Sequence, residues 1–158
     1  GAEMVRVETV QQMLEAVLNA AQDADGLVMA AAVADFRVKN VAGNKLKKRD
    51  GIPQIELEAA PDILATVASQ RGHAPRLKVV VGFAAESRDL LENAQAKLAS
   101  KKLDFIAAND ISAGDAGFAV ETNRITLLYA DGRREELPLL SKSEVADHIL
   151  TRVAEILE

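Results

Sequence analysis

The stretch Leu27-Val28-Met29-Ala30-Ala31-Ala32 is a continuous run of apolar residues. Such a run is typical of a parallel strand that is buried on both faces. Two further segments, residues 77–83 and residues 105–108, have the same apolar character. Each of the three is short enough for a strand and is followed by polar residues, so we predict three neighbouring buried strands.

Helical patterns lie on either side of these strands. Residues 9–12, Thr-Val-Gln-Gln, form a capping box that predicts a helix to about Asp23. A second helix is predicted to about Gln70, with Pro61 at its first position and Asp62 in its first turn. A third is predicted over residues 89–102. Residues 141–144, Ser-Lys-Ser-Glu, are a capping box for a final amphipathic helix.

The remaining segments are of a different kind. Residues 53–58 alternate between apolar and polar side chains, which predicts a strand with one solvent-exposed face. Residues 125–129 and 134–139 flank Asp131-Gly132, a strong signal for a type I′ hairpin. Strands that alternate with helices favour a parallel sheet covered on both faces. We therefore predict a Rossmann-like, three-layer α/β/α fold with a mainly parallel sheet and an appended antiparallel hairpin.

The composition excludes several classes of protein. A chain of 158 residues is one domain of ordinary size. It has no cysteine and two histidines, which excludes disulfides, makes a zinc enzyme improbable and fits a reducing cytoplasm. A net charge of -5 argues against a general nucleic-acid binder. No apolar run approaches the ~20 residues that span a membrane.

The segment that follows the first strand favours nucleotide binding. Residues 30–37 read Ala-Ala-Ala-Val-Ala-Asp-Phe-Arg, and Lys45-Leu46-Lys47-Lys48 stand on the long loop beyond them, followed by Arg49. Small side chains let a ligand approach the backbone closely. Asp35 can hold a metal ion, a sugar or a base edge, and the lysines suit a polyphosphate. An isolated Asp or a lysine run is more often a turn residue or a solvated surface, so both interpretations stay open.

Polar residues also follow the other two buried strands. They are Asp35, the turn 83–86 and the pair Asn109-Asp110, and in such folds ligands bind at the carboxyl ends of the strands. Lys97 and Lys101 are four residues apart, so they share one helix face. The two lysines are equally compatible with a ligand site and with a solubilising surface. Phe83 could be a core residue or a ring that stacks on a base. Glu86 could be a charge in the first turn of a helix or a site residue. The Gly-rich phosphate-binding motifs are absent.

Taken in order, the motifs resemble a known family. They are Ala-Ala-Val-Ala-Asp-Phe-Arg, Lys-Leu-Lys-Lys, Pro-Asp-Ile-Leu, Gly-Phe-Ala-Ala-Glu, the pair Lys97 and Lys101, and Ala-Asn-Asp-Ile-Ser. Together they resemble phosphopantothenate–cysteine ligase, the synthetase half of the bacterial bifunctional coenzyme A biosynthesis protein. The resemblance implies CTP and Mg²⁺, an acyl-cytidylate intermediate, and a ligation of cysteine to 4′-phosphopantothenate. It also implies a homodimer and a fused flavin (FMN) decarboxylase domain that is absent from these residues.

The resemblance also implies roles for individual residues. Lys45 would be the catalytic lysine and would touch the CTP phosphates, and the loop after Lys48, within a flap over about residues 37–52, would close over the intermediate. Ala31 and Ala32 would contact the phosphopantothenate substrate. The remaining CTP-binding residues would contact the base, ribose or triphosphate: Met29, Ala30, Ala31, Asp35, Ala60, Pro61, Asp62, Ile63, Phe83, Lys97 and Lys101.

Two departures from the family pattern affect these expectations. Relatives often have Asn where this chain has Ala60, and the family's Gly-rich N-terminal segment with its catalytic Asn is not present. We therefore expect residues 1–158, as a single truncated ligase domain, to bind CTP weakly or not at all. The hairpin at residues 131–132 is the expected dimer contact. Two alternatives remain open, a nicotinamide-dependent oxidoreductase fragment and a non-catalytic dimerisation module.

Overall fold

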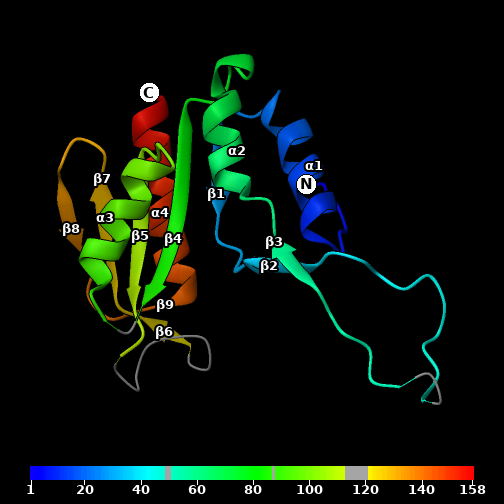
Figure 1. Ribbon diagram of the computed structural model, residues 1–158. Helices are drawn as coiled ribbons and strands as arrows, with labels where there is room; N and C mark the ends of the chain where they lie inside the picture. The colour runs from blue at the N-terminus through cyan, green and yellow to red at the C-terminus, as the bar shows by residue number, and fades with distance from the viewer. Residues whose placement is uncertain (49–50, 87, 113–120) are drawn as a thin grey trace.

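The computed structural model describes residues 1–48, 51–86, 88–112 and 121–158 (Figure 1). A five-stranded sheet has the order β1-β4-β5-β7-β8. The first three strands, β1 (Gly26–Met29), β4 (Val79–Glu86) and β5 (Phe105–Asp110), run parallel to one another. The last two, β7 (Ile125–Tyr129) and β8 (Arg134–Glu136), form an antiparallel hairpin that pairs with β5 through β7. The predicted mainly parallel sheet with an appended hairpin is confirmed.

Helices cover both faces of this sheet, which gives three layers (Figure 1). One face packs against α1 (Val10–Ala21), α2 (Ile63–Gln70) and α3 (Leu90–Ser100), and the other against α4 (Lys142–Leu157). Alternation along β4 explains the two cores, because Val80 and Ala84 face the first group of helices while Val79 and Val81 face α4. The two cores contain mostly aliphatic side chains, as the scarcity of aromatic residues predicts.

The helix boundaries follow their caps. Both capping boxes are formed, by Thr9 with Gln12 at α1 and by Ser141 with Glu144 at α4. The start of α2 differs from the prediction. Asp62 is the N-cap, its side chain accepts a hydrogen bond from the Ala65 amide, and Pro61 therefore precedes the helix. An Asp side chain satisfies the free amides of a first turn, which proline cannot do, so the Asp fixes the boundary.

The first strand is shorter and more exposed than the continuous apolar run predicts. β1 ends at Met29, where its partner in the ladder is Gly82, and residues 30–32 leave the sheet and are exposed. In the sheet that the described residues form, β1 lies at the edge, and Val28 is 37% exposed on it. An apolar run shows that a segment can be buried, but the neighbours that bury it are set by tertiary structure.

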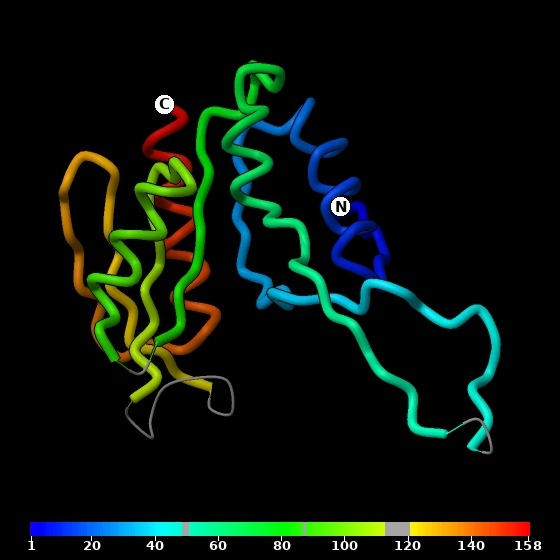
Figure 2. Tube along the Cα trace, in the orientation of Figure 1, coloured from blue at the N-terminus to red at the C-terminus, as the bar shows by residue number. Residues whose placement is uncertain are grey.

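A long arm projects from the body (Figure 2). We use this name for residues 36–59, which comprise β2 (Phe36–Val38), β3 (Leu57–Ala59) and the chain between them. The predicted irregular loop begins with a strand, β2, and the strand predicted over residues 53–58 is limited to β3. These two short strands pair antiparallel at the base of the arm. Arg37 and Glu58 form an ion pair of 2.8 Å across them. Arg49 and Asp50, part of the predicted flap, lie outside the described residues.

The hairpin between β7 and β8 forms with a different turn from the predicted one. Leu128 pairs with Arg134, and the Gly132 amide donates to the Tyr129 carbonyl at 3.0 Å. A type I′ turn needs positive φ at both central residues, but here Gly132 has φ 89° and Asp131 does not have a positive φ. The same Asp-Gly sequence is also compatible with a three-residue loop that has glycine in the left-handed position. Strand β8 ends the sheet with the exposed, ion-paired Arg134 and Glu136.

Three small elements complete the chain, the 3₁₀ turn Arg71–His73 and the paired strands β6 (Thr122–Asn123) and β9 (Leu140–Ser141). Arg71 joins the turn to the sheet, because it forms an ion pair of 2.8 Å with Asp104. The Asp104 carboxylate also accepts from the Val80 amide at 2.7 Å. Among the described residues, no helix combines the length and the apolar character that a membrane crossing requires.

An ion pair between the hairpin and α4 leads to a pH-dependent prediction. Arg152 donates to both oxygens of Glu135 at 2.8 and 2.9 Å, and these hydrogen bonds lower the pKa of the Glu135 carboxyl. A carboxyl whose pKa is lower in the folded state stabilises the fold at pH values above the ordinary glutamate pKa. This stabilisation is lost as the pH falls through the folded-state pKa. Glu135→Gln is expected to lower the free energy of unfolding by about 1 kcal/mol at pH 7.

Urea unfolding measured at pH 7 and at pH 3 to 4 tests this. The difference in free energy of unfolding between the wild type and Glu135→Gln should shrink on acidification, because the Glu135 carboxyl takes up its proton at a higher pH in the unfolded chain than in the folded protein. Glu136→Gln, a neighbouring carboxylate on the exposed edge, is the control and should change little at either pH. If the free energies of unfolding of the wild type and Glu135→Gln differed by the same amount at both pH values, the charge on Glu135 would not be stabilising.

Candidate functional site

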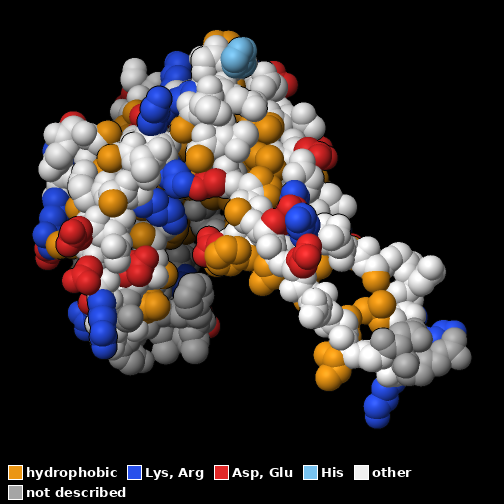
Figure 3. Space-filling view, viewed as in Figure 1, with side chains coloured by type: hydrophobic (Ala, Val, Ile, Leu, Met, Phe, Trp, Pro, Cys, Tyr) orange, Lys and Arg blue, Asp and Glu red, His pale blue; other side chains and the backbone are white. Residues whose placement is uncertain are grey.

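A cavity of about 500 Å³ opens between α2 and α3, beside the carboxyl ends of β1 and β4. Figure 3 shows basic and acidic side chains side by side where the surface is hollowed between the two halves of the molecule. Ten of the twelve residues predicted to bind CTP line the cavity: Met29, Ala31, Asp35, Ala60, Pro61, Asp62, Ile63, Phe83, Lys97 and Lys101. Four separate segments of the sequence therefore meet at this cavity.

The strand ends bring the first two segments together. After β1 ends at Met29, the small residues 30–34 run to Asp35, which is exposed. The Asp35 carbonyl accepts a hydrogen bond of 2.8 Å from the Ala60 amide. This bond extends the β2–β3 ladder by one step toward the body, so the base of the arm fixes Asp35 against the segment that leads into α2.

The two lysines enter the cavity from the end of α3. Lys97 lies in the last turn, and its ammonium group donates to the Phe83 carbonyl at 2.6 Å. Lys101 is the C-cap residue, and its ammonium group forms an ion pair with the Asp62 carboxylate. The side chain of Lys101 is 22% exposed and that of Asp62 is 47% exposed. The prediction that both lysines share one face is confirmed, and that face is turned to the cavity rather than to bulk solvent.

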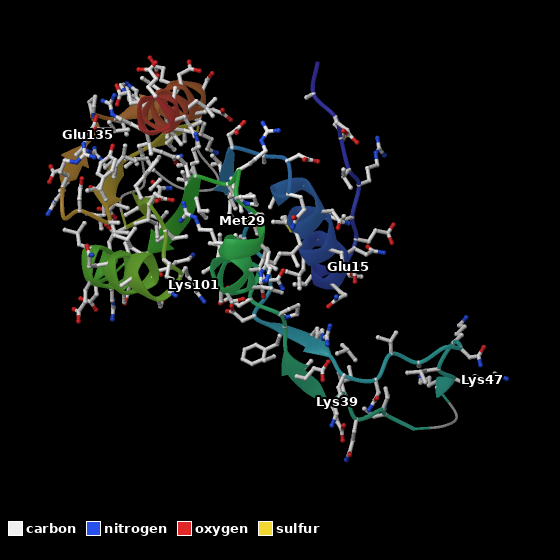
Figure 4. The ribbon with its side chains drawn as sticks, turned by 90° about the horizontal axis from the view of Figure 1, so that it is seen from above. Glu15, Met29, Lys39, Lys47, Lys101 and Glu135 are labelled. Atoms are coloured by element: carbon white, nitrogen blue, oxygen red, sulfur yellow. The ribbon has the colours of Figure 1, made fainter. Side chains whose placement is uncertain are left out.

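Three predicted residues do not line the cavity. Ala30 and Ala32 belong to the exposed segment after β1 but are not part of the cavity wall, and Lys45 is an exposed residue of the arm. Figure 4 shows Met29 and Lys101 in the body of the molecule, with Lys39 and Lys47 along the arm and Lys47 at its far end. The lysine-rich part of the arm and the cavity are therefore separate in this conformation.

Further residues complete the wall of the cavity, and sequence reasoning did not single them out. Ala96 and Ser100 belong to the face of α3 that presents the two lysines, because positions 96, 97, 100 and 101 are related by helical spacing. That spacing is a signal that would have found them. Leu64 follows Ile63 in the first turn of α2, and Val33 and Ala34 continue the small-residue segment.

The other predicted strand-end residues lie outside the cavity. Glu86 and Asp110 pair with each other in the β4–β5 register, and Asn109 is adjacent. The Asn109 side-chain amide donates to the Asn123 side chain at 3.3 Å, while its own buried side-chain oxygen has no hydrogen-bond partner among the described residues. Of the strand-end residues that the sequence indicates, Asp35 and Phe83 line the cavity, whereas the last residues of β4 and β5 do not.

The charges of the cavity suit an anionic ligand that has an uncharged portion. Two ammonium groups stand on the α3 side, and Met29, Ile63 and Phe83 supply apolar surface. The carboxylates of Asp35 and Asp62 also line it. Nowhere in the described ranges do three acidic or histidine side chains gather closely enough to hold a metal ion.

This fold and this cavity define a Rossmann-like α/β protein with a cavity near the carboxyl end of its first parallel strand, the region where such folds bind ligands. The profile of the DNA/pantothenate metabolism flavoprotein C-terminal domain matches residues 1–157, and the chain belongs to that family. The family relationship predicted from the motifs is confirmed. The chain is 42% identical to the coenzyme A biosynthesis bifunctional protein CoaBC of Bacillus subtilis over 153 residues, which cover 97% of this chain and 37% of that protein.

Other relatives agree. The CoaBC protein of Mycobacterium tuberculosis H37Rv is 42% identical over 164 aligned positions, covering 99% of this chain and 39% of that protein. A crystal structure of the C-terminal domain of a CoaBC protein superposes with a TM-score of 0.75 at 37% identity, over 97% of this chain and 65% of that one. A structure of the Cab2 mutant H337A in complex with phosphopantothenate-cysteine shares the fold, with a TM-score of 0.70 at 17% identity over 97% of this chain and 53% of that one. The chain spans less than half the length of these two CoaBC proteins.

Proposed function

We propose that this chain carries the CTP-binding part of a phosphopantothenate–cysteine ligase that acts in coenzyme A biosynthesis. The observation that supports this most directly is the cavity beside the ends of β1 and β4, where Lys97 and Lys101 stand opposite the end of β1 and the start of α2. A triphosphate requires concentrated positive charge, and a base requires an apolar wall with backbone groups nearby. The cavity offers both within one site.

The proposed reaction has two steps. A carboxylate oxygen of 4′-phosphopantothenate attacks the α-phosphorus of CTP, a new O–P bond forms, and pyrophosphate leaves. The amine of cysteine then attacks the acyl carbon, the acyl–oxygen bond breaks, and CMP leaves as the amide forms and the amine loses a proton. Charge builds on phosphoryl oxygens in the first step, so fixed ammonium groups lower its barrier.

The cavity residues would divide between the two ends of the nucleotide. Backbone groups of residues 29–31 and the Asp35 carboxylate would contact the cytidine, and the Phe83 ring would pack against the base. Lys97 and Lys101 would hold the triphosphate as compact point charges. A lysine pair on one helix replaces the Gly-rich phosphate loop that the sequence lacks.

Magnesium would enter this site with the nucleotide. The only carboxylates that line the cavity within the described residues are those of Asp35 and Asp62, which come from different segments. Mg²⁺ usually retains several waters and binds through one or two carboxylates together with substrate phosphates. The residues present fit that arrangement, and Mg²⁺ would neutralise phosphate charge there.

The arm would supply the catalytic group. Lys45 is exposed and stands away from the cavity, so the arm would have to close, over its own cavity or over that of a second copy. Closure would also exclude water from the acyl-cytidylate. Exposed apolar residues cluster along the arm: Phe36, Val38, Val41, Leu46, Ile52, Ile55 and Leu57. Ile52 is 98% exposed, and such residues favour a surface that is covered in the working protein.

The same apolar residues revise the expected dimer contact. Strand β8 was the expected edge for pairing, but Arg134 and Glu136 are exposed on it, and charged side chains discourage edge-to-edge association. We therefore propose that a homodimer forms through the arm. The fused decarboxylase domain and the substrates phosphopantothenate and cysteine remain part of the proposal, supported by the CoaBC relatives and by the ligand of the Cab2 complex.

Isothermal titration of the full-length protein tests the nucleotide assignment. CTP with Mg²⁺ is expected to release heat with a single-site isotherm, while ATP and NADP⁺ at the same concentration release little. NADP⁺ is included because an oxidoreductase with this fold would bind it. Equal binding of ATP would contradict the CTP assignment, and binding of NADP⁺ alone would replace the ligase proposal. Residues 1–158 alone are expected to bind CTP weakly.

A further inference from the structure

We propose that the Asp62 carboxylate occupies the position in the cavity where a phosphate would bind Lys101, and that it competes with an incoming polyphosphate for that lysine. Asp62 thus sets how much negative charge a ligand must bring in order to bind Lys101. This inference rests on the proposed function, since it concerns the same phosphate end of the cavity.

The two oxygens of Asp62 have different partners. Oδ1 accepts from the Ala65 amide at 2.9 Å and caps α2, while Oδ2 forms the ion pair with Lys101 at the end of α3. A helix N-terminus and a lysine ammonium are both groups that bind phosphate in proteins. Here one carboxylate satisfies both, so it stands where an external anion would be attracted. The ion pair also bridges α2 and α3, the two helices that flank the cavity.

The second lysine is in a different state. Lys97 donates to the neutral Phe83 carbonyl at 2.6 Å, and no carboxylate is recorded against it among the described residues. The positive charge of Lys97 is therefore available to a ligand, while that of Lys101 is neutralised by Asp62. The first contact of an anionic ligand is expected at Lys97, and the contact with Lys101 requires the carboxylate to be displaced or shared.

Displacement favours ligands with several phosphates. A phosphate oxygen beside Lys101 comes close to the Asp62 carboxylate, and two like charges about 4 Å apart repel each other appreciably near a protein surface. A triphosphate brings enough charge to bind both lysines and outcompete one carboxylate. A single phosphate does not, so a monophosphate product would leave readily once pyrophosphate has gone.

The substitution Asp62→Asn separates the two roles of this side chain. Asparagine caps a helix as well as aspartate does but carries no charge, so α2 should remain capped while Lys101 is released. We expect inorganic tripolyphosphate, titrated without Mg²⁺ into the full-length protein, to bind about tenfold more tightly to Asp62→Asn than to the wild type. The affinity for orthophosphate should increase by a larger factor than the affinity for tripolyphosphate. Asp62→Asn should therefore prefer the polyphosphate less strongly than the wild type does.

Three further variants complete the test. In a Lys101→Ala background the Asp62→Asn substitution should lose most of its effect, because the pair is already broken. Asp62→Ser also caps the helix and should reproduce the gain if asparagine perturbs the fold. Asp25→Asn removes the carboxylate of the surface ion pair with Arg76 and should leave binding unchanged. Thermal melting of each variant reports whether the cap is retained.

The outcomes are distinct. Weaker or unchanged tripolyphosphate binding by both capped variants overturns the proposal, since Asp62 would then orient Lys101 instead of competing with the ligand. Tighter binding that persists in the Lys101→Ala background overturns it as well. If the expected pattern appears with tripolyphosphate but CTP is not preferred over ATP, this inference stands and the nucleotide assignment fails.

Discussion

Lys101→Ala in the full-length protein is expected to weaken CTP binding by about a hundredfold, the effect of losing a partly buried charge that contacts phosphate. Two contributions combine. The ammonium group that would hold the triphosphate is lost, and Asp62 is left without its partner at the same position. The exposed fraction of Lys101 is only 22%, so solvent replaces little of the missing charge.

Titration calorimetry with CTP and Mg²⁺ measures this loss. Lys102→Ala is the matched control, because Lys102 is the next residue in the chain but is exposed and does not line the cavity. Lys97→Ala should also weaken binding, and it additionally removes the hydrogen bond to the Phe83 carbonyl. Unimpaired CTP binding by Lys101→Ala would mean that the triphosphate is held outside this cavity.

Lys45→Ala is expected to lower kcat of the ligation by about a thousandfold while CTP binding changes only a few-fold. The physical reason is the position of the residue. Lys45 is exposed on the arm and separate from the cavity, so it adds little to binding in the open conformation. Its contribution arises after closure, when charge develops on the phosphoryl oxygens, and an interaction made only in the transition state appears in kcat.

Steady-state kinetics of amide formation, combined with CTP titration of the same variant, distinguishes binding from catalysis. Lys47→Ala is the control on the same arm, since Lys47 lies at its far end in Figure 4 and is not assigned a catalytic role. If Lys45→Ala weakened CTP binding by as large a factor as it lowered kcat, Lys45 would be part of the ground-state nucleotide site. An unchanged rate would favour a non-catalytic role for these residues, such as dimerisation.

The parts of the fold that the sequence predicts well are those in which local signals agree. The strands β4 and β5 are apolar runs with buried partners on both sides, and α1 and α4 begin at capping boxes that determine their first residues. The edge strand and the arm are different. β2 pairs with β3 across some twenty intervening residues, and neither segment has a pattern of its own that identifies this partner.

The site shows the same division. Asp35, Phe83 and the lysine pair on α3 could be grouped from the strand order and the helical spacing, and they line the cavity, whereas residues 60–63 are indicated only by the family resemblance. The ion pair between Asp62 and Lys101 could not be predicted, because it depends on where the start of α2 stands relative to the end of α3. The separation of Lys45 from the cavity likewise depends on the direction of the arm, which no local pattern specifies.

The arm also determines what a single backbone cut would do to this molecule. The chain before the arm, with α1 and β1, and the chain after it, beginning with α2, pack into one shared core. A protease that cleaved the exposed segment between β2 and β3 would leave two fragments held together by that core. The nicked molecule would keep its circular dichroism spectrum and its nucleotide cavity. It would lose the continuous tether that carries Lys45, so binding and turnover would be uncoupled by one hydrolysed peptide bond.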